Sequence, residues 1–194
     1  MLLHGVIHVE NSANNGEALA FVLCYNMGVG NTVGRRINIP QESDWAYIAG
    51  FFDGDGSLMV QLKNRRDTKR GWRIMVTLSF YQDTRHRKPL QWMQEVLGIG
   101  YIHDRNDGIT ELKVNGYSRV RSILQHMQPY VRFKSYQVKK ALKILTILED
   151  KEFLSLSRQT RRQLADCYNA LRNANYAAHR RKFSDEQVKE LLTR

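Results

Sequence analysis

Two carboxylates that could hold a metal ion, Asp53 and Asp55, follow a mostly apolar segment, Trp45–Phe52, which lacks the alternation of a β-strand. Ser43 and Asp44 are good N-cap candidates, so we expect a helix that begins near them and ends near the carboxylates. The carboxyl end of a helix disfavours negative charge by a few tenths up to about 1 kcal/mol. We therefore expect a bound cation that offsets this cost.

Gly50 and Gly54 lie in the same segment, four residues apart. On a helix this spacing puts them one turn apart on one face. Because that face carries little side chain, another backbone could approach it closely. The two glycines therefore predict a surface for close packing.

The charge of the chain favours a polyanionic partner. The 194 residues include 30 Lys and Arg against 19 Asp and Glu, a formal net charge of +11 that is typical of nucleic-acid-binding proteins. Charge that serves only solubility is the alternative. Cys24 and Cys167 fit no metal or redox motif, so we expect ordinary thiols in a reducing compartment.

Targeting and membrane segments are not evident in the sequence. The first residues lack a basic region followed by a long apolar core, as a signal peptide requires. The apolar run at 18–25 is far shorter than the roughly 18 residues of a membrane span. We expect an intracellular protein with no membrane partner, in an organelle or in a prokaryotic cytoplasm.

The periodicity of the chain predicts three parts. Residues 1–42 are expected to form a loosely ordered extension, residues 43–150 a core domain, and residues 151–194 basic C-terminal helices. After the first helix, the patterns predict strands at 58–65, 73–80, 100–104 and 109–114, and helices at 88–97, 117–127, 134–149 and 157–178, with a short last helix capped by Ser184 and Gln187. The core order, αββαββα, predicts an α+β fold with helices on one face of a four-stranded antiparallel sheet.

The other face of this sheet is expected to be exposed and to bind DNA. Gln, Arg and Lys are side chains that read base edges and contact phosphates, and a curved ribbon of this width fits the major groove. A merely solvated face is the alternative. The predicted DNA-binding residues are Gln61, Lys63, Arg65, Arg73, Thr77, Ser79, His103, Arg105, Glu111 and Lys113.

The segment Ile48-Ala-Gly-Phe-Phe-Asp-Gly-Asp-Gly56 closely resembles the LAGLIDADG signature of homing endonucleases, and the αββαββα order resembles that family's core. The resemblance covers roughly residues 44–148. It is strongest to the single-motif, group I intron-encoded members that act as homodimers. The signature occurs once in the chain, which implies that two chains are needed for each double-strand cut.

The resemblance implies roles for individual residues. Asp55 would bind the catalytic metal, assisted by the carbonyl of Gly54, while Gln82 would order water around the metal. Lys134 would stabilise charge on the scissile phosphate or tune the attacking water. A further basic residue is expected at or near His86, with Arg85, Arg87 and Lys88 equally available. The implied metal is Mg²⁺, which Mn²⁺ could replace, and Ca²⁺ could bind without supporting cleavage.

A homodimer would place Ala49, Gly50, Asp53 and Gly54 at the interface and bring two copies of Asp55 together. Phosphates of the DNA would then complete the coordination, which suits Mg²⁺ because this ion is usually bound by few protein ligands. Asp53 is interpreted as a structural or capping carboxylate and not as a direct ligand.

The resemblance implies a site-specific endonuclease that cuts double-stranded DNA at a long pseudo-palindromic target and so promotes intron mobility. The alternative is an RNA maturase, a splicing cofactor that binds intron RNA without cleaving DNA. Comparing the affinities for intron RNA and for duplex DNA at matched salt would discriminate between them. The capped helix after Ser184 gives weaker support to a helix-turn-helix regulator.

Overall fold

A computed structural model describes residues 40–68, 70–150, 152–175 and 182–193. The first part of the predicted N-terminal extension, residues 1–39, therefore lies outside the described residues, as do Arg180 and Arg181 of the basic C-terminal segment. Contacts group Asn38–Arg194 into one unit. Within the described residues, none of the helices is long and apolar enough to cross a membrane.

The core has the predicted αββαββα order. It consists of α1 (Glu42–Asp55), β1 (Gly56–Asn64), β2 (Trp72–Asp83), the 3₁₀ turn η1 (Thr84–His86), α2 (Arg87–Leu97), β3 (Tyr101–Asp104), β4 (Ile109–Asn115) and α3 (Tyr117–Met127). After it come α4 (Ser135–Asp150), the 3₁₀ turn η2 (Phe153–Ser155), α5 (Arg158–Ala174) and α6 (Asp185–Thr193). The predicted α+β fold is thus confirmed.

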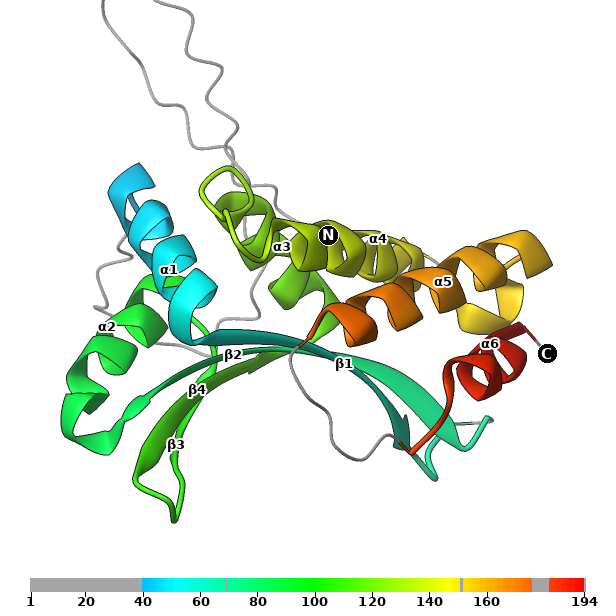
Figure 1. Cartoon of the computed structure of the whole chain (residues 1–194), viewed down its shortest axis with the longest axis horizontal. Helices are drawn as coiled ribbons and strands as arrows, with labels where there is room; N and C mark the ends of the chain where they lie inside the picture. Colours follow the sequence, from blue (N-terminus) through cyan, green and yellow to red (C-terminus); the bar gives the residue numbers. More distant parts are fainter. Residues whose placement is uncertain (1–39, 69, 151, 176–181, 194) are drawn as a thin grey trace, which may run out of the picture. The chain divides into compact units, whose positions relative to one another are not determined.

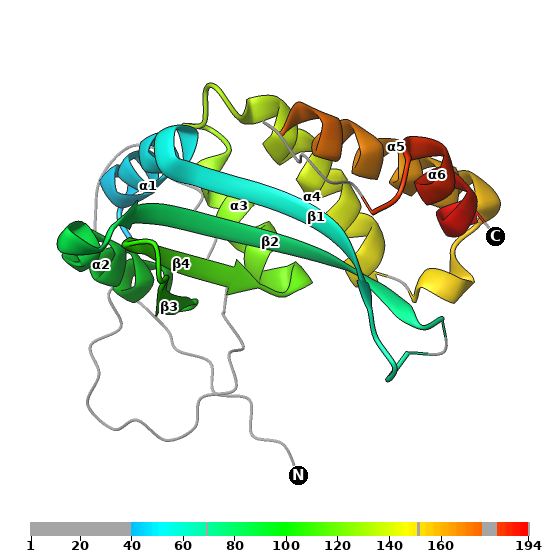
Figure 2. The ribbon, with the colours of Figure 1, turned by 60° about the horizontal axis from the view of Figure 1, so that its bottom comes forward.

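The four strands form one antiparallel sheet in the order β1-β2-β4-β3 (Figure 2). The helices lie over one face of this sheet, which arches beneath them (Figure 1). Alternate residues of β1 and β2, such as Leu58, Val60, Val76 and Leu78, point into the core between the layers. The opposite, concave face is therefore the one that can receive a ligand.

The start of α1 differs from the prediction. The helix begins at Glu42, with Gln41 as its N-cap, and the carboxylate of Asp44 accepts a hydrogen bond of 2.9 Å from the backbone N–H of Gln41. Ser43 and Asp44 are therefore residues of the first turn and not N-caps. The negative charge of Asp44 still lies at the end of the helix where the macrodipole favours it.

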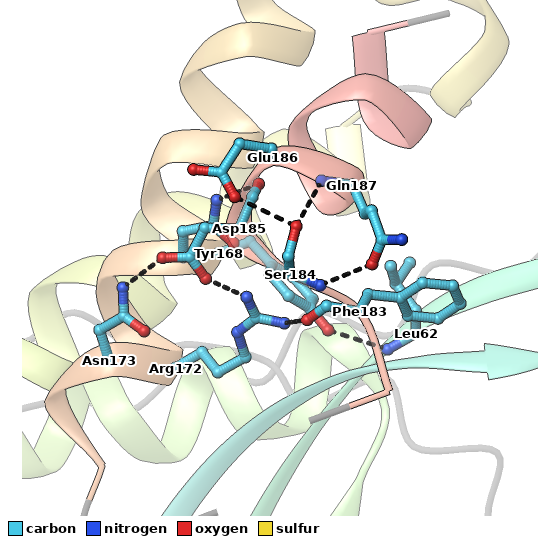
Figure 3. A network of polar contacts seen from close by, with 10 residues as sticks. Leu62, Tyr168, Arg172, Asn173, Phe183, Ser184, Asp185, Glu186 and Gln187 are labelled. Atoms are coloured by element: carbon cyan, nitrogen blue, oxygen red, sulfur yellow. Dashed lines mark hydrogen bonds and ion pairs between the residues drawn. The ribbon is translucent and has the colours of Figure 1, made fainter. Parts of the chain in front are cut away.

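The helices α5 and α6 are joined by a polar network around Arg172 (Figure 3). The Arg172 guanidinium donates to the Phe183 carbonyl oxygen at 2.9 Å and forms an ion pair with Asp185, whose other oxygen accepts from Asn173 at 2.7 Å. The predicted capping box is confirmed, because Ser184 N–H donates to Gln187 at 2.8 Å and Gln187 N–H donates to Ser184 at 3.1 Å. These bonds fix the start of α6 on α5.

Arg172→Met should lower the free energy of unfolding by about 2 kcal/mol. Removing one partner of a fully buried ion pair typically costs about 3–5 kcal/mol, and we expect less here because the Asp185 side chain is partly exposed. The Arg172 side chain is only 12% exposed and Asp185 is 34% exposed. A thermal melt should show a fall in Tm of about 4–8 °C. Arg162→Met, at an exposed position of the same helix, is the control and should leave Tm within about 1 °C. An equal Tm for both variants would contradict the role of the network.

Candidate functional site

The chain turns sharply where α1 meets β1. Gly56 follows Asp55, and a Cβ atom on Gly56 would lie 2.4 Å from Phe52 Cδ2 and 2.6 Å from the Phe52 carbonyl oxygen. Side chains other than hydrogen do not fit at such distances. This turn puts Asp53 and Asp55 at the carboxyl end of α1, as the sequence predicts.

Asp53 is bound to the main chain of a distant segment. Its carboxylate accepts hydrogen bonds from the backbone N–H groups of Arg132 at 2.6 Å, Phe133 at 3.1 Å and Lys134 at 3.0 Å. Asp53 thereby holds the segment before α4 against the end of α1, in agreement with the structural role expected of it. Asp53 stays partly exposed, so its place at an interface between two chains remains a prediction.

The carboxyl end of α1 also holds a cation that belongs to the chain itself, the ammonium group of Lys134. Lys134 Nζ lies 2.7 Å from the carbonyl oxygen of Phe52, 3.0 Å from that of Asp53, 3.2 Å from that of Gly54 and 2.8 Å from that of Gly56. The carbonyls of Asp53 and Gly54 are among those that a helix end leaves without intrahelical partners. Burial lowers the pKa of Lys134, and the charges of Asp53 and Asp55 act in the opposite direction.

Asp55 differs from Asp53 in being exposed and open to a ligand. Its side chain has no hydrogen bond or ion pair to any residue in the part of the chain that the structure describes. Carboxylate oxygens are the ligands that Mg²⁺ prefers, so Asp55 fits a divalent ion. The Gly54 carbonyl has a second lone pair beyond its 3.2 Å contact with Lys134, so it remains a possible second ligand. Among the described residues, no three His, Cys, Asp or Glu side chains form a cluster for a metal.

A hollow of about 380 Å³ opens beside this junction. It runs from the end of α1 to the start of β1 and to the loop before α4. The lining residues are Asp53, Gly54, Gly56, Ser57, Leu58, Phe133, Lys134, Gln137 and Asn175. The junction is therefore an open, polar site on the surface of the chain.

Gln82 lies at the same end of the sheet. Gly56, the first residue of β1, pairs with Phe80, which lies two residues before Gln82 in β2. Gln82 Oε1 accepts a hydrogen bond of 2.9 Å from the backbone N–H of Asp83. The structure therefore brings Asp55, Gly54 and Lys134 together directly and places Gln82 at the neighbouring strand.

Four basic residues follow Gln82, and two of them are held by carboxylates. Arg85 binds Asp83 through two contacts of 2.9 and 2.8 Å, which hold the pKa of Asp83 well below its usual range. Arg87 forms an ion pair with Asp104. His86 and Lys88 are exposed and make no such ion pair with the described residues, and the Arg85 side chain is 84% exposed in spite of its pairing, so each of these three can turn toward a substrate.

The concave face of the sheet carries most of the predicted DNA-binding residues. Lys63, Arg73 and His103 are exposed on it, and Gln61 and Lys113 are half-buried. Arg65 and Arg105 differ from the prediction because they lie just past the ends of β1 and β3, where each pairs with a nearby carboxylate, Asp67 or Asp107.

Three of the predicted DNA-binding residues, Thr77, Ser79 and Glu111, are buried. The expectation that they are exposed is therefore wrong, because longer neighbours cover the middle of the concave face. Lys113 Nζ lies 2.8 Å from Glu111 Oε2. Burial alone would raise the pKa of Glu111, but hydrogen bonds, chiefly from Lys113, outweigh it and the pKa is lowered. A charged pair therefore lies at the centre of this face.

The exposed face of α1 is bare around its glycines. A Cβ atom on Gly50 or Gly54 would meet nothing within 4 Å. Ala49, in contrast, is fully buried in the core of the chain, which contradicts its predicted place at an interface. The residue faces the sheet because it lies on the same side of the helix as Phe52 and Ile48.

Sequence reasoning missed three exposed aromatic residues near α1. Tyr47 is 55% exposed and its ring packs edge-on against Trp92, which is 37% exposed, with ring centroids 5.3 Å apart. Phe133, in the loop that Asp53 binds, is 86% exposed. The exposure of Trp92 could have been predicted from the sequence, because this residue lies outside the apolar face of α2 that Leu90, Met93 and Leu97 form.

The sequence has relatives among known proteins. A family profile described as LAGLIDADG endonuclease matches residues 48–148. DNA endonuclease I-CvuI of Chlorella vulgaris is 32% identical over 108 residues, which are 56% of this chain and 67% of that protein. DNA endonuclease I-CreI of Chlamydomonas reinhardtii is 30% identical over 99 residues, which are 51% of this chain and 60% of that protein.

Solved structures show the same fold. The crystal structure of I-CvuI in complex with its target, in the presence of 2 mM Ca, has a TM-score of 0.68 at 27% identity, covering 78% of this chain and 93% of that chain. The archaeal intron-encoded homing endonuclease I-Vdi141I complexed with DNA has a TM-score of 0.65 at 22% identity, covering 78% and 95%.

Proposed function

Because the chain belongs to the LAGLIDADG endonuclease family, we propose that it is a site-specific homing endonuclease that hydrolyses double-stranded DNA with divalent metal ions. The observation that carries this proposal is Asp55, an exposed carboxylate at the end of the signature helix beside the ammonium of Lys134. A long target that is nearly palindromic would match the symmetry of two identical chains.

In the proposed reaction, Asp55 and the Gly54 carbonyl hold the metal, for which we propose Mg²⁺. A bound divalent ion supplies an activated water and neutralises charge on the phosphate. Gln82 holds water near the site, and Lys134 adds positive charge at a fixed position. One of the exposed residues Arg85, His86 and Lys88 provides the further basic group near the phosphate.

The concave face is proposed to lie in the major groove. Lys63, Arg73 and His103 are exposed there, and cations of this kind contact phosphates or the acceptor edges of guanine. Gln61 and Lys113 are partly exposed and remain candidates for reading bases. Thr77, Ser79 and Glu111 are not proposed as direct contacts, since they are buried.

A homodimer is proposed to form through the bare face of α1. Gly50 and Gly54 permit close packing of two helices, and Tyr47, Trp92 and Phe133 supply exposed apolar surface around them. Two copies of Asp55 would then meet near the twofold axis, each beside one strand of the DNA.

Gly50→Leu should separate folding from dimerisation. The added side chain has room in one chain, and leucine has a higher helix propensity than glycine, by up to about 1 kcal/mol. We expect a folded monomer with unchanged or raised Tm and loss of cleavage, measured by sedimentation and thermal melts. Ser118→Leu, at an exposed position of α3, is the control and should stay dimeric. A dimeric, active Gly50→Leu variant would contradict this interface.

The function is tested by selecting a target from random DNA with the purified full chain and then adding Mg²⁺ to plasmid that carries the selected site. We expect cuts in both strands within the site, replacement of Mg²⁺ by Mn²⁺, and binding without cleavage in Ca²⁺. Sequence-specific binding without cleavage in any of these ions would refute the nuclease, and tighter binding to structured intron RNA at matched salt would then favour a maturase.

A further inference from the structure

The β1–β2 hairpin runs on past the rest of the sheet (Figure 2). β4 pairs with β2 only over Thr77–Asp83, so the outer part of the hairpin, from Val60 to Val76, is two-stranded. Isolated two-stranded hairpins are marginally stable in water. Other contacts must therefore set the direction in which the tip of this hairpin points.

Arg70, in the turn of the hairpin, packs against two aromatic rings that also contact each other. Its guanidinium carbon lies 4.6 Å from the ring centroid of Trp72 and 4.1 Å from that of Phe153, and these two rings pack edge-on with centroids 5.2 Å apart. Phe153 belongs to η2, at the entry to the C-terminal helices, and is almost completely buried. Arg70 thus ties the tip of the hairpin to a part of the chain about eighty residues away.

The segment that holds Phe153 is itself fixed to α5. Arg161 donates a hydrogen bond of 2.9 Å to the Leu154 carbonyl oxygen, and its guanidinium carbon lies 5.2 Å from the Phe153 ring. Tyr168 of α5 accepts a hydrogen bond of 3.1 Å from the backbone N–H of Leu62 in β1. The C-terminal helices therefore hold the hairpin at its tip and also along its edge.

Arg70 differs from the other cations around it. Lys63, Arg65 and Arg66 are exposed, whereas Arg70 is partly buried against its two rings, and this burial lowers the pKa of its guanidinium. A guanidinium held in this way orders the turn instead of reaching outward to a phosphate. The turn also has its own hydrogen bonds, from Arg65 N–H to the Gly71 carbonyl oxygen at 2.9 Å and from Thr68 Oγ1 to the Trp72 carbonyl oxygen at 3.2 Å.

We propose that Arg70 and Phe153 form a clamp that positions the hairpin tip, and so determines specificity at the outer base pairs of each half-site. This inference rests on the proposed DNA-binding function. The nine residues of β1 begin beside Asp55 and span roughly 30 Å at about 3.3 Å per residue. At about 3.4 Å per base pair, the tip lies roughly eight or nine base pairs from the cut. A tip that is already ordered cannot adapt to a mismatched base pair, so only matching sequences are bound tightly.

The inference is tested by measuring binding of the full-length protein to a library in which each base pair of the selected target is varied, in Ca²⁺. The variants are Arg70→Met, which keeps the length of the stem, and Phe153→Leu, which leaves all charges in place. One mismatch ordinarily costs roughly 5- to 150-fold in affinity. In both variants we expect this penalty to fall below about threefold at positions more than about eight base pairs from the cut, and to stay unchanged nearer the centre. Arg70→Lys should restore only part of it, because an ammonium keeps the positive charge but not the planar group that packs on the rings.

Arg66→Met is the matched control, because Arg66 is an exposed cation in the same turn. It should weaken binding to all sequences alike and lower the salt dependence by about one unit of slope. The clamp is disproved if Arg70→Met behaves as Arg66→Met does, or if Phe153→Leu keeps full discrimination at the outer positions. Because binding is measured without cleavage, a protein that binds but does not cut refutes the nuclease and leaves this test intact.

Discussion

Asp55→Asn should abolish metal-dependent cleavage while the protein stays folded and binds its target. Mutation of a residue that only supports a metal ligand typically lowers metal affinity or activity by about 10- to 100-fold. Removal of the ligand itself should therefore lower the cleavage rate by more than about 100-fold. Asp55 is exposed and makes no hydrogen bond within the described residues, so the free energy of unfolding should change by no more than about 0.5 kcal/mol. Single-turnover cleavage, a binding assay in Ca²⁺ and a thermal melt together measure these effects.

Asp53→Asn is the matched control, since it makes the same chemical change two residues away. Its carboxylate accepts three backbone N–H bonds, and hydrogen bonds to charged groups contribute about 1.5–3 kcal/mol each. We expect a loss of about 2 kcal/mol overall, with a fall in Tm of about 4–8 °C, because the amide oxygen can replace part of the bonding. If Asp55→Asn lowers Tm as much as Asp53→Asn, or cleaves at the normal rate, the assigned roles are wrong.

Lys134→Met should reduce both stability and cleavage. Removal of the ammonium group leaves the carbonyls of Phe52, Asp53, Gly54 and Gly56 without their shared cation. We expect the free energy of unfolding to fall by about 2–3 kcal/mol, and Tm by roughly 4–12 °C. Cleavage should fall at least about tenfold even well below Tm, because the positive charge beside Asp55 is lost.

Lys139→Met, at an exposed position of α4, is the control for Lys134→Met and should change Tm by about 1 °C or less. Single-turnover cleavage at a temperature where both variants are folded separates the two effects of Lys134. Stability that falls while cleavage is unchanged would leave Lys134 with a purely structural role. A Tm equal to that of the native protein would contradict the contacts at the end of α1.

The elements of the fold were predictable because each has a clear local pattern. The alternation of Arg73, Met75 and Thr77 with Ile74, Val76 and Leu78 matches β2, and Gly98 ends α2 in the left-handed conformation with φ of 63°. The bare face around Gly50 and Gly54 was predictable in the same way, because helical periodicity alone puts the two glycines together.

The contacts that complete the site could not be predicted from local pattern. Asp53 and Lys134 are 81 residues apart, and only the tertiary fold brings the Asp53 carboxylate to the Lys134 backbone N–H and the Lys134 ammonium to the Asp53 carbonyl. Alternation also predicts which face of a strand a side chain lies on, but not whether its neighbours cover it. For this reason Thr77, Ser79 and Glu111 were placed on the correct face and wrongly expected to be exposed.

The central claim, that Asp55 holds the catalytic metal, is tested most directly by crystals of the protein bound to its selected target in Mn²⁺, with anomalous diffraction locating the ions. We predict an anomalous peak within about 2.0–2.3 Å of a carboxylate oxygen of Asp55 in each of two chains, with a DNA phosphate as a further ligand. Ions bound at the cut without Asp55, or bound equally well in crystals of Asp55→Asn, would contradict the account.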